Sequence, residues 1–503
     1  MLRRQFLALS ALATAQQRRL PNIVFILADD LGWGDLSCYN PQSKIKTPHL
    51  DKLAAQGIRF TDAHTPSSVC TPTRYGLLTG RYSWRTRLKH GVQDGFDPPL
   101  IEKGRLTVAS MLQQHGYATA CIGKWHLGMN WTRNDGSPMP FRTQGGFRPG
   151  DDIDFSKPAT NGVNAAGFDE YYGISASLDM PPYCFLENGR PTAPPSQRMP
   201  RGMSLFLNQP EGVSCQGFTL EGVIPALTQR AVAFVERNAA KPFFLYVPLS
   251  SPHLPVVPNT AFDGKSGAGR YGDFVVEMDA AVGRILDALD KTGAAANTLV
   301  CFSSDNGGLW HWWDFSEPDD VRDGKITPRA QYNKDHGHQS NAWMRGTKAD
   351  AWEGGHRVPF LARWPGRIKP GSVSHSLICL TDFLATCAGA VNHKLPVASA
   401  EDSFSLLPAF ADPKREIRDH VVHHTLHGKF AIRMGEWKLI AERGSGGFSV
   451  PRSVTPNQGE AAGQLYNLRT DPGETKNLYL DHPQIAARLR ARLETIQATP
   501  RTR

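Results

Sequence analysis

Short apolar runs alternate with amphipathic segments along most of the chain. Four of these runs are continuously apolar, as expected for strands that are buried on both faces of a sheet: Asn22–Ala28, Tyr117–Ile122, Pro242–Val247 and Thr298–Ser304. Segments with helical spacing lie between them: Thr107–His115, Leu220–Asn238 and Phe274–Thr292. This alternation predicts an α/β fold with a large, mostly parallel sheet sandwiched by helices.

The pattern changes near residues 408–420. Beyond this point, Phe430–Met434 and Glu436–Ile440 have the character of two paired strands around Gly435, and Pro483–Gln497 has the spacing of an amphipathic helix. We therefore expect a large domain over residues 21–410 and a small α+β domain over residues 411–503.

The composition is that of a folded protein with a sizeable core. Of the 503 residues, 40% are hydrophobic and 20% are charged, which excludes a disordered chain. No apolar run approaches the ~20 residues that a membrane span requires, so an integral membrane protein is excluded. The formal net charge of +9 suits an anionic substrate or nucleic acid. Because no nucleic-acid-binding motif accompanies it, we expect no nucleic-acid partner.

The first residues have the pattern of an export signal. Arg3 and Arg4 precede the apolar stretch Phe6–Ala13, and Ala13-Thr14-Ala15 is a small-x-small cleavage pattern. We expect residues 1–15 to be a signal peptide and the mature protein to be periplasmic or secreted. The arginine pair suits the twin-arginine route, but Leu2 departs from it, so the general secretory route stays open.

Eight cysteines are present, and no C-x-x-C pair occurs among them. This excludes a zinc ribbon and a thioredoxin-like site. Cys121 and Cys301 lie inside apolar runs and are expected to be core thiols. The spacing is not that of a disulfide scaffold, although an exported protein can form one or two bridges.

Reactive residues follow all four predicted strands: Asp29-Asp30, Gly123-Lys124-Trp125-His126, Ser250-Ser251-Pro252-His253 and Asp305-Asn306-Gly307-Gly308. Ligands of open α/β sheets bind beyond the carboxyl ends of the strands, so parallel strands would bring these groups to one edge. Asp29, Asp30, Asp305 and Asn306 offer only oxygen ligands, which Ca²⁺ and Mg²⁺ prefer. Turn and capping roles are the alternative. The segment Asp335-His336-Gly337-His338 is a weaker metal candidate, because no strand precedes it.

The most specific signal is Cys70-Thr71-Pro72-Thr73-Arg74. Pro72 suits the first turn of a helix, and Cys70 would then lie at the helix N-terminus, where free amide groups favour an anion. Arg74 lies one turn further on and can reach the same place. A buried structural cysteine is the alternative interpretation.

This motif, followed by Leu77-Leu78-Thr79-Gly80-Arg81, resembles the signature of the sulfatase family, and in particular its bacterial members related to arylsulfatase A and N-acetylgalactosamine-6-sulfatase. The resemblance runs from Pro21 to the C-terminal domain. It includes Lys124 and His126 in GKWHLG, His253 in SSPHLP, Asp305-Asn306 in SSDNGG and Lys348 in RGTK. It implies the alkaline phosphatase superfamily fold and conversion of Cys70 to Cα-formylglycine by a formylglycine-generating enzyme. It also implies one Ca²⁺ ion, held by Asp29, Asp30, Cys70, Asp305 and Asn306.

The resemblance also implies a role for each catalytic candidate. One hydroxyl of the hydrated aldehyde would attack sulfur and the other would drive the release of sulfate. Asp305 would help to deprotonate the attacking hydroxyl, and His126 would assist elimination. His253 and Lys348 would hold the sulfate and protonate the leaving alcohol. Arg74, Lys124, Lys348 and calcium would offset charge on the sulfate oxygens.

We therefore expect a sulfuric ester hydrolase that acts on a sulfated carbohydrate and on artificial aryl sulfates. The alternatives are a phosphonate or phosphate ester hydrolase and a calcium-dependent glycan-binding protein without activity. The sugar, the sulfated position, endo or exo action and the oligomeric state stay open. So does the role of the long segment Trp310–Gln339, whose tryptophans would either stack on a sugar or anchor the segment to the core.

Overall fold

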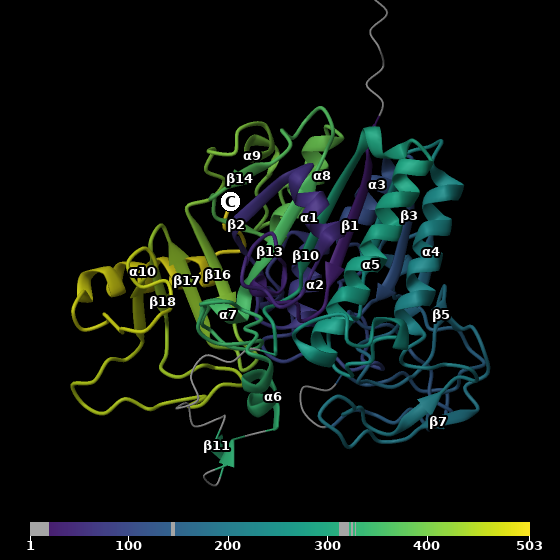
Figure 1. Cartoon of the computed structure of the whole chain (residues 1–503), viewed down its shortest axis with the longest axis horizontal. Helices are drawn as coiled ribbons and strands as arrows, with labels where there is room; N and C mark the ends of the chain where they lie inside the picture. The colour runs from purple at the N-terminus through teal and green to yellow at the C-terminus, as the bar shows by residue number, and fades with distance from the viewer. Residues whose placement is uncertain (1–19, 142–145, 311–320, 323–324, 327) are drawn as a thin grey trace, which may run out of the picture.

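A large mixed sheet forms the centre of the molecule (Figure 1). The computed structural model describes residues 20–141, 146–310, 321–322, 325–326 and 328–503. The sheet has 11 strands in the order β14-β2-β13-β10-β1-β9-β3-β4-β5-β6, with β15 also paired to β2. Their bounds are β1 Asn22–Ala28, β2 Ile58–His64, β3 Ala118–Lys124, β4 Glu170–Ile174, β5 Leu186–Glu187, β6 Arg190–Pro191, β9 Phe243–Pro248, β10 Thr298–Ser304, β13 Arg357–Arg363, β14 Ser372–Ser374 and β15 Ile378–Cys379.

The strands that carry the predicted site residues are parallel neighbours. β10 pairs with β1, β1 with β9, β9 with β3 and β3 with β4, all in parallel. β13 runs antiparallel between β10 and β2, and β5 and β6 form an antiparallel edge. The prediction of a mostly parallel sheet is therefore confirmed.

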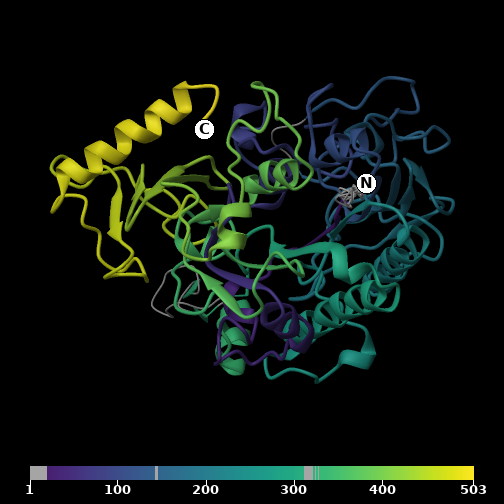
Figure 2. The same cartoon turned by 90° about the horizontal axis from the view of Figure 1, so that it is seen from above.

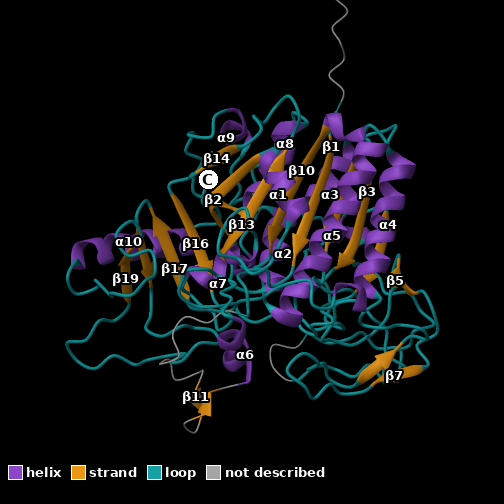
Figure 3. Cartoon of the chain, viewed as in Figure 1, coloured by secondary structure: helices purple, strands orange, loops and turns teal. Residues whose placement is uncertain are grey.

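Helices cover both faces of this sheet (Figure 3). In β1, Ile23, Phe25 and Leu27 pack in one core cluster, and Val24, Ile26 and Ala28 pack in the other. Because side chains alternate along a strand, both faces of β1 are apolar and its run is continuous. The first cluster contains residues of α2 (Cys70–Thr79), α3 (Val108–Gln114), α8 (Phe383–Ala390) and α9 (Leu407–Ala411). The second contains residues of α1 (Pro48–Ala55), α4 (Val223–Asn238) and α5 (Gly269–Lys291).

A second, antiparallel sheet lies at one end of the molecule (Figure 2). Its strands follow one another as β16 (His420–His424), β17 (Phe430–Met434), β18 (Trp437–Ile440) and β19 (Gln464–Asn467), and α10 (Pro483–Ala498) packs against it. Met434 pairs with Trp437, so Gly435 and Glu436 form the turn, and Gly435 supplies the positive φ of 56° that such a turn needs. The domain boundary near residue 410 stays a prediction.

The long buried elements were predicted to within a few residues, and strands with an interrupted apolar pattern were missed. β2 alternates between buried and half-buried positions, and β13 contains Pro359, so neither has the continuous apolar pattern. The smaller elements are β7 (Gln197–Met199), β8 (Gly212–Ser214), β11 (Val321–Arg322), β12 (Lys325–Ile326), α6 (Pro328–His336), α7 (Glu353–His356) and the short 3-10 helices Trp33–Asp35, Ser83–Arg85, Asn164–Ala166, Thr260–Phe262, Ala294–Asn297 and Leu380–Asp382. None of the helices in the described ranges is long and apolar enough to cross a membrane.

The cysteines agree with the expectation of a sparse disulfide pattern. Cys184 and Cys215 form a disulfide. Cys121 and Cys301 are free thiols inside the core, as predicted. The predicted signal peptide lies outside the described residues.

Candidate active site

The four loops that follow β1, β3, β9 and β10 meet at the carboxyl edge of the main sheet. The amide of Asp29 donates to the carbonyl of Ser251 (3.0 Å), and the amide of Asp305 donates to the carbonyl of Ala28 (3.1 Å). The structure thus brings the predicted strand-end residues together because their strands are parallel neighbours.

Helix α2 brings Cys70 to this edge. The helix begins at Cys70, directly after the extended residue Val69, and ends before Gly80, which takes the left-handed conformation (φ 64°). The Cys70 sulfur, carboxylate oxygens of Asp29 and Asp30 and a ring nitrogen of His253 all lie within 4.8 Å of one another. The cysteine is therefore buried among charged groups and is no ordinary core thiol.

Three cations neutralise the buried carboxylates. Arg74 Nη2 lies 2.7 Å from Asp305 Oδ2 and 3.6 Å from Asp29 Oδ1. Lys124 Nζ lies 2.6 Å from Asp29 Oδ2, and Lys348 Nζ lies 2.8 Å from Asp30 Oδ1. The two lysines and the arginine therefore compensate charges that would be very costly to bury alone.

The carboxylates respond differently to this crowding. Burial raises the pKa of Asp29, but Lys124, His253 and Arg74 outweigh burial and lower it below its usual value. Burial likewise raises the pKa of Asp30, and Lys348 and His253 lower it overall. For Asp305, burial and the charge of Asp29 prevail over the nearby cations, so its pKa is raised. The lowered pKa values keep Asp29 and Asp30 ionised, and their negative charges lie close to the Asp305 carboxyl at this edge of the sheet.

The donor set fits a hard cation. Asp29 Oδ1 and Asn306 Oδ1 are buried, and neither accepts a hydrogen bond from any residue that the structure describes. Orphaned buried oxygens are costly unless a further group satisfies them. Three carboxylates and an amide offer the oxygen ligands that Ca²⁺ prefers. These residues, with the side chain at position 70, would hold the ion.

His126 is a neutral base with a free nitrogen. Its Nε2 donates to the carbonyl of Gln93 (2.7 Å), whereas its buried Nδ1 has no partner among the described residues. Burial, together with the charges of Lys124 and Arg74, holds the pKa of His126 well below its usual value. The ring therefore presents an unprotonated Nδ1 to the site.

His253 is held in its protonated form by its surroundings. Its Nε2 lies 3.6 Å from Asp30 Oδ2. Burial and Lys348 lower the pKa of His253, but Asp30, Asp29 and Asp179 outweigh them and raise it to about 9. The opposite shifts leave the ring of His126 neutral and the ring of His253 protonated at neutral pH.

The backbone is strained at two of these positions. Asp30 has a φ of 64°, and His126 has a φ of 56°. Non-glycine residues seldom adopt such left-handed conformations, and structures keep them mainly where a side chain must be aimed. Here the unusual backbone turns a carboxylate and an imidazole towards the same edge.

Ser177 was not predicted from the sequence. It follows β4, and its hydroxyl accepts from Lys124 Nζ (3.2 Å) and lies 3.2 Å from His253 Nδ1. It thereby joins two candidate catalytic side chains. The only sequence signal was the presence of Ser175 and Ser177 after Ile174, and it is weak because β4 itself was not predicted from its pattern.

The segment after Gly308 does not offer Trp310 as an exposed platform. Trp310 is buried and stacks on Phe206 (ring centroids 5.5 Å apart) and Tyr271 (5.7 Å). The interpretation that this tryptophan anchors the segment to the core is confirmed for Trp310. Trp312 and Trp313 lie outside the described residues.

The weaker metal candidate around His336 and His338 gains no support from the described part of the chain. His336 Nδ1 bonds to the carbonyl of Tyr332 (2.8 Å), whereas His338 Nε2 bonds to Asp35 Oδ1 (2.7 Å). The two rings thus serve separate structural contacts, and no metal-binding group of described residues contains them.

A large α/β sheet with helices on both faces, followed by a smaller antiparallel sheet, defines an alkaline phosphatase-like fold. Comparison with known proteins narrows this further: the family model named Sulfatase matches residues 21–393. The chain is 32% identical to an N-acetylgalactosamine-6-O-sulfatase of Bacteroides thetaiotaomicron, an alignment that covers 96% of this chain and 94% of the relative. It is 33% identical to arylsulfatase A of Homo sapiens, in an alignment that covers 92% of this chain and 83% of the relative.

A solved structure agrees with these relatives. This structure was described in work on the metabolism of glycosaminoglycans by Bacteroides thetaiotaomicron, and its sequence is 30% identical to this chain. The two superpose with a TM-score of 0.80 over 96% of this chain and 100% of the other. The chain belongs to the sulfatase family, and it is a sulfuric ester hydrolase.

The geometry predicts that Ser177→Ala lowers kcat on an aryl sulfate by about tenfold or more, because hydrogen bonds to charged groups contribute about 1.5–3 kcal/mol. Lys124 and His253 would lose their shared partner. Ser175→Ala is the matched control, since Ser175 is also buried but its hydroxyl has no partner among described residues. Equal kinetics for the two variants would remove Ser177 from the site.

Proposed function

We propose that this sulfatase removes sulfate from a sulfated carbohydrate and that Cys70, as Cα-formylglycine, carries the nucleophile. The observation that carries the proposal is the placement of Cys70 at the N-terminus of α2, within 4.8 Å of Asp29, Asp30 and His253. The carbohydrate class is supported by the relative that is an N-acetylgalactosamine-6-O-sulfatase and aligns with nearly the whole chain.

The side chains around Cys70 suit a sulfate ester. Lys124, His253 and Lys348 are buried and approach the carboxylates that surround position 70. Positive groups held in place in a buried site stabilise charge that develops on sulfate oxygens far better than mobile groups in water. Arg74 contacts Asp305 and Asp29, so we assign it to holding the carboxylates and the local charge balance.

Proton transfers fall to three residues. The hydrate of formylglycine supplies two hydroxyl groups at position 70, and Asp305, whose pKa is raised, lies in the same carboxylate cluster as a proton acceptor. His126 presents an unprotonated Nδ1 and is assigned to the proton that must leave when sulfate is released. His253, with Lys348 beside it, is assigned to protonating the leaving alcohol.

Calcium, when bound, supplies positive charge that polarises a sulfate oxygen and balances the carboxylates. Asp29, Asp30, Asp305, Asn306 and position 70 are the residues proposed to hold it, on the strength of their oxygen donors and the two orphaned acceptors.

Export and maturation are part of the proposal. The pattern of Arg3-Arg4 and the apolar stretch supports a signal peptide over residues 1–15 and a periplasmic or secreted protein. The disulfide between Cys184 and Cys215 supports an oxidising compartment. A formylglycine-generating enzyme would act on Cys70 during maturation.

A second candidate reaction, phosphonate or phosphate ester hydrolysis, shares the motif around Cys70. Comparing the turnover of an aryl sulfate and an aryl phosphate with the same leaving group separates the two. We expect the sulfate to be turned over at the higher kcat/KM, in line with the family match.

The modification of Cys70 is tested by intact peptide mass spectrometry of active enzyme, which should show an aldehyde or its hydrate at position 70. Cys70→Ala should fold normally and lose nearly all turnover, since the nucleophile is gone. Cys121→Ala is the control, because Cys121 is a buried thiol inside β3. Fully active protein with an unmodified thiol at position 70 would exclude the mechanism.

Removal of the metal should lower the melting temperature as well as activity, because the buried carboxylates would then repel one another. EDTA treatment followed by Ca²⁺ should restore both, and Zn²⁺ should not. Asp305→Ala should cost more activity than Asn306→Ala, because it also removes the proposed proton acceptor. Restoration by zinc alone would show that the ligand assignment is wrong.

Protonation by His253 is tested by the choice of leaving group. A sugar alcohol has a high pKa and needs a proton to leave, whereas an activated phenol does not. His253→Ala should therefore lose up to ~10²–10⁴-fold more kcat/KM on a sulfated saccharide than on an activated aryl sulfate. Arg74→Ala is the comparator and should depress both substrates alike. If His253→Ala loses the same factor of kcat/KM on both substrates, His253 is not the acid, and Lys348 becomes the candidate for that role.

A further inference from the structure

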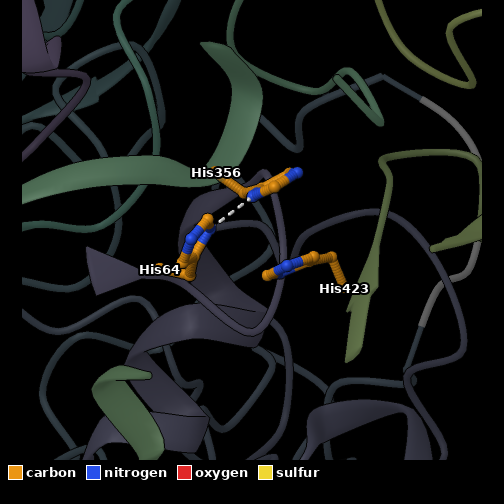
Figure 4. Close-up of side chains that lie close together, drawn as sticks. All are labelled: His64, His356 and His423. Carbon is orange, nitrogen blue, oxygen red and sulfur yellow. Dashed lines mark hydrogen bonds between the residues drawn. The ribbon is translucent and has the colours of Figure 1, made fainter. Parts of the chain in front are cut away.

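Three buried histidines meet where the main sheet contacts the C-terminal sheet (Figure 4). His64 ends β2, His356 ends α7 and His423 lies in β16. All three are at most 1% exposed. We call them the histidine cluster; it lies outside the set of residues to which the catalytic roles are assigned.

Hydrogen bonds define the protonation of two of these rings. His64 Nε2 lies 2.9 Å from Asp62 Oδ1, so Nε2 carries the proton that it donates. In the neutral ring, His64 Nδ1 is then the acceptor for His356 Nδ1–H (3.1 Å). His356 Nε2 lies 3.0 Å from Lys438 Nζ and 3.2 Å from the carbonyl of Ala351. An ammonium group only donates, so the nearer Lys438 makes this nitrogen an acceptor, and both rings are neutral in this assignment.

The third ring completes the contact to the chain before Cys70. His423 Nδ1 donates to the carbonyl of Thr65 (2.8 Å), and its buried Nε2 has no partner in the described part of the chain. The ring stacks on His356, with centroids 3.7 Å apart and planes 13° apart. Two nearly parallel rings in contact do not aim their lone pairs at one ion. The stack, with Lys438 at His356, therefore favours a proton-controlled cluster over a metal site.

The cluster holds a loop that leads to the candidate nucleophile. The amide of Thr65 donates to the carbonyl of His356 (2.8 Å), and the amide of Ser68 donates to the carbonyl of His424 in β16 (3.1 Å). The carbonyl of Ser68 in turn accepts from the amide of Ala349 (2.8 Å). Cys70 lies two residues after Ser68, and Lys348 directly precedes Ala349. The chain next to each of these two candidate catalytic residues is therefore hydrogen-bonded at the contact between the two sheets.

The surrounding charges leave little to stabilise added protons. The carboxylates that face the cluster are Asp62 on β2, Glu353 on α7 and Glu474 in the loop after β19, and the cations are Lys438 on β18, Arg433 on β17 and Arg357 on β13. Lys438 lies 3.0 Å from Glu353 and 2.8 Å from Glu474, and Arg433 lies 2.7 Å from Asp62. Asp62 is paired with Arg433, whereas Glu353 and Glu474 share Lys438, and burial together with Glu353 raises the pKa of Glu474 to about 7. Glu474 therefore takes up a proton in the docked state below about pH 7, which offsets the effect of one of the three histidines.

We propose that His64, His356 and His423 are positioning residues that hold the loop before Cys70 against the C-terminal sheet only while they are neutral. Acid pH then releases the loop and turns the enzyme off. The consequence for activity rests on the proposed role of Cys70, whereas the release of the loop does not.

The direction of the pH effect follows from burial. Burial lowers the pKa of all three histidines in the folded protein, in spite of nearby carboxylates. A released histidine titrates near 6.5, so below that pH the released state takes up protons that the docked state excludes. The docked state is fully favoured above about pH 6.5. Below it, each histidine shifts the equilibrium towards release by up to about tenfold per pH unit.

Hydrogen exchange of the full chain tests the release directly. After correction for intrinsic exchange rates, peptides covering residues 65–68 should lose more than tenfold in protection between pH 7.5 and pH 5.0, while the central strand β1 keeps its protection. In His423→Asn, the amide nitrogen takes the place of Nδ1 and cannot titrate. The loss of protection should therefore shrink by about tenfold, and kcat on an aryl sulfate should persist to lower pH.

His393→Asn is the matched control, because His393 is hydrogen-bonded to another histidine, His115 (3.0 Å), away from the cluster. It should leave the pH dependence unchanged. If His423→Asn does not fold, His64→Gln serves instead, since its amide can donate to Asp62 in place of Nε2.

Equal acid loss of protection in wild type and His423→Asn would overturn the proposal. So would an increase in protection on adding stoichiometric Zn²⁺ at pH 7.5, which would show a metal site. If the protein is inactive at every pH but its hydrogen exchange changes with pH as expected, the proposed role of Cys70 is contradicted. The positioning role of the three histidines is then still supported.

Discussion

The site depends on burying three carboxylates side by side at the ends of parallel strands. Asp29, Asp30 and Asp305 are almost wholly inaccessible, and like charges in such a place repel strongly. Buried cations make the arrangement possible: Arg74 comes from α2, Lys124 ends β3, and Lys348 lies in the loop before α7. The three cations therefore come from three separate elements that meet at the sheet edge.

The same compensation prepares the site for its substrate. The cations are already desolvated and held by carboxylates, so they need little reorganisation when an anionic ester approaches. Two buried oxygens, the carboxylate Oδ1 of Asp29 and the amide Oδ1 of Asn306, have no hydrogen-bond partner among the described residues and suit a hard cation. Ser177 adds a neutral link between Lys124 and His253. Fixed charges of both signs in a buried place are what hydrolysis of a sulfate ester requires.

The C-terminal sheet is joined to this chemistry through the chain before Cys70. Ser68 bonds to β16 on one side and to Ala349, beside Lys348, on the other. Buried histidines and the pairs of Lys438 with Glu353 and Glu474 lie at that contact. The small sheet therefore supports the entry of α2 as well as extending the core.

The sequence by itself determined the elements whose signal is local. Largely apolar runs specified β1 and β10 to the residue, because burial of both faces favours apolar side chains at consecutive positions, and Pro72 with Cys70 marked the start of α2. The motifs also named the ten candidate site residues. Their partners were decided only by the tertiary structure: Arg74 with Asp305, Lys348 with Asp30, Ser177 between two cations, and the histidine cluster. These contacts join residues far apart in the chain, and they depend on the order of strands in the sheet, which local periodicity does not encode.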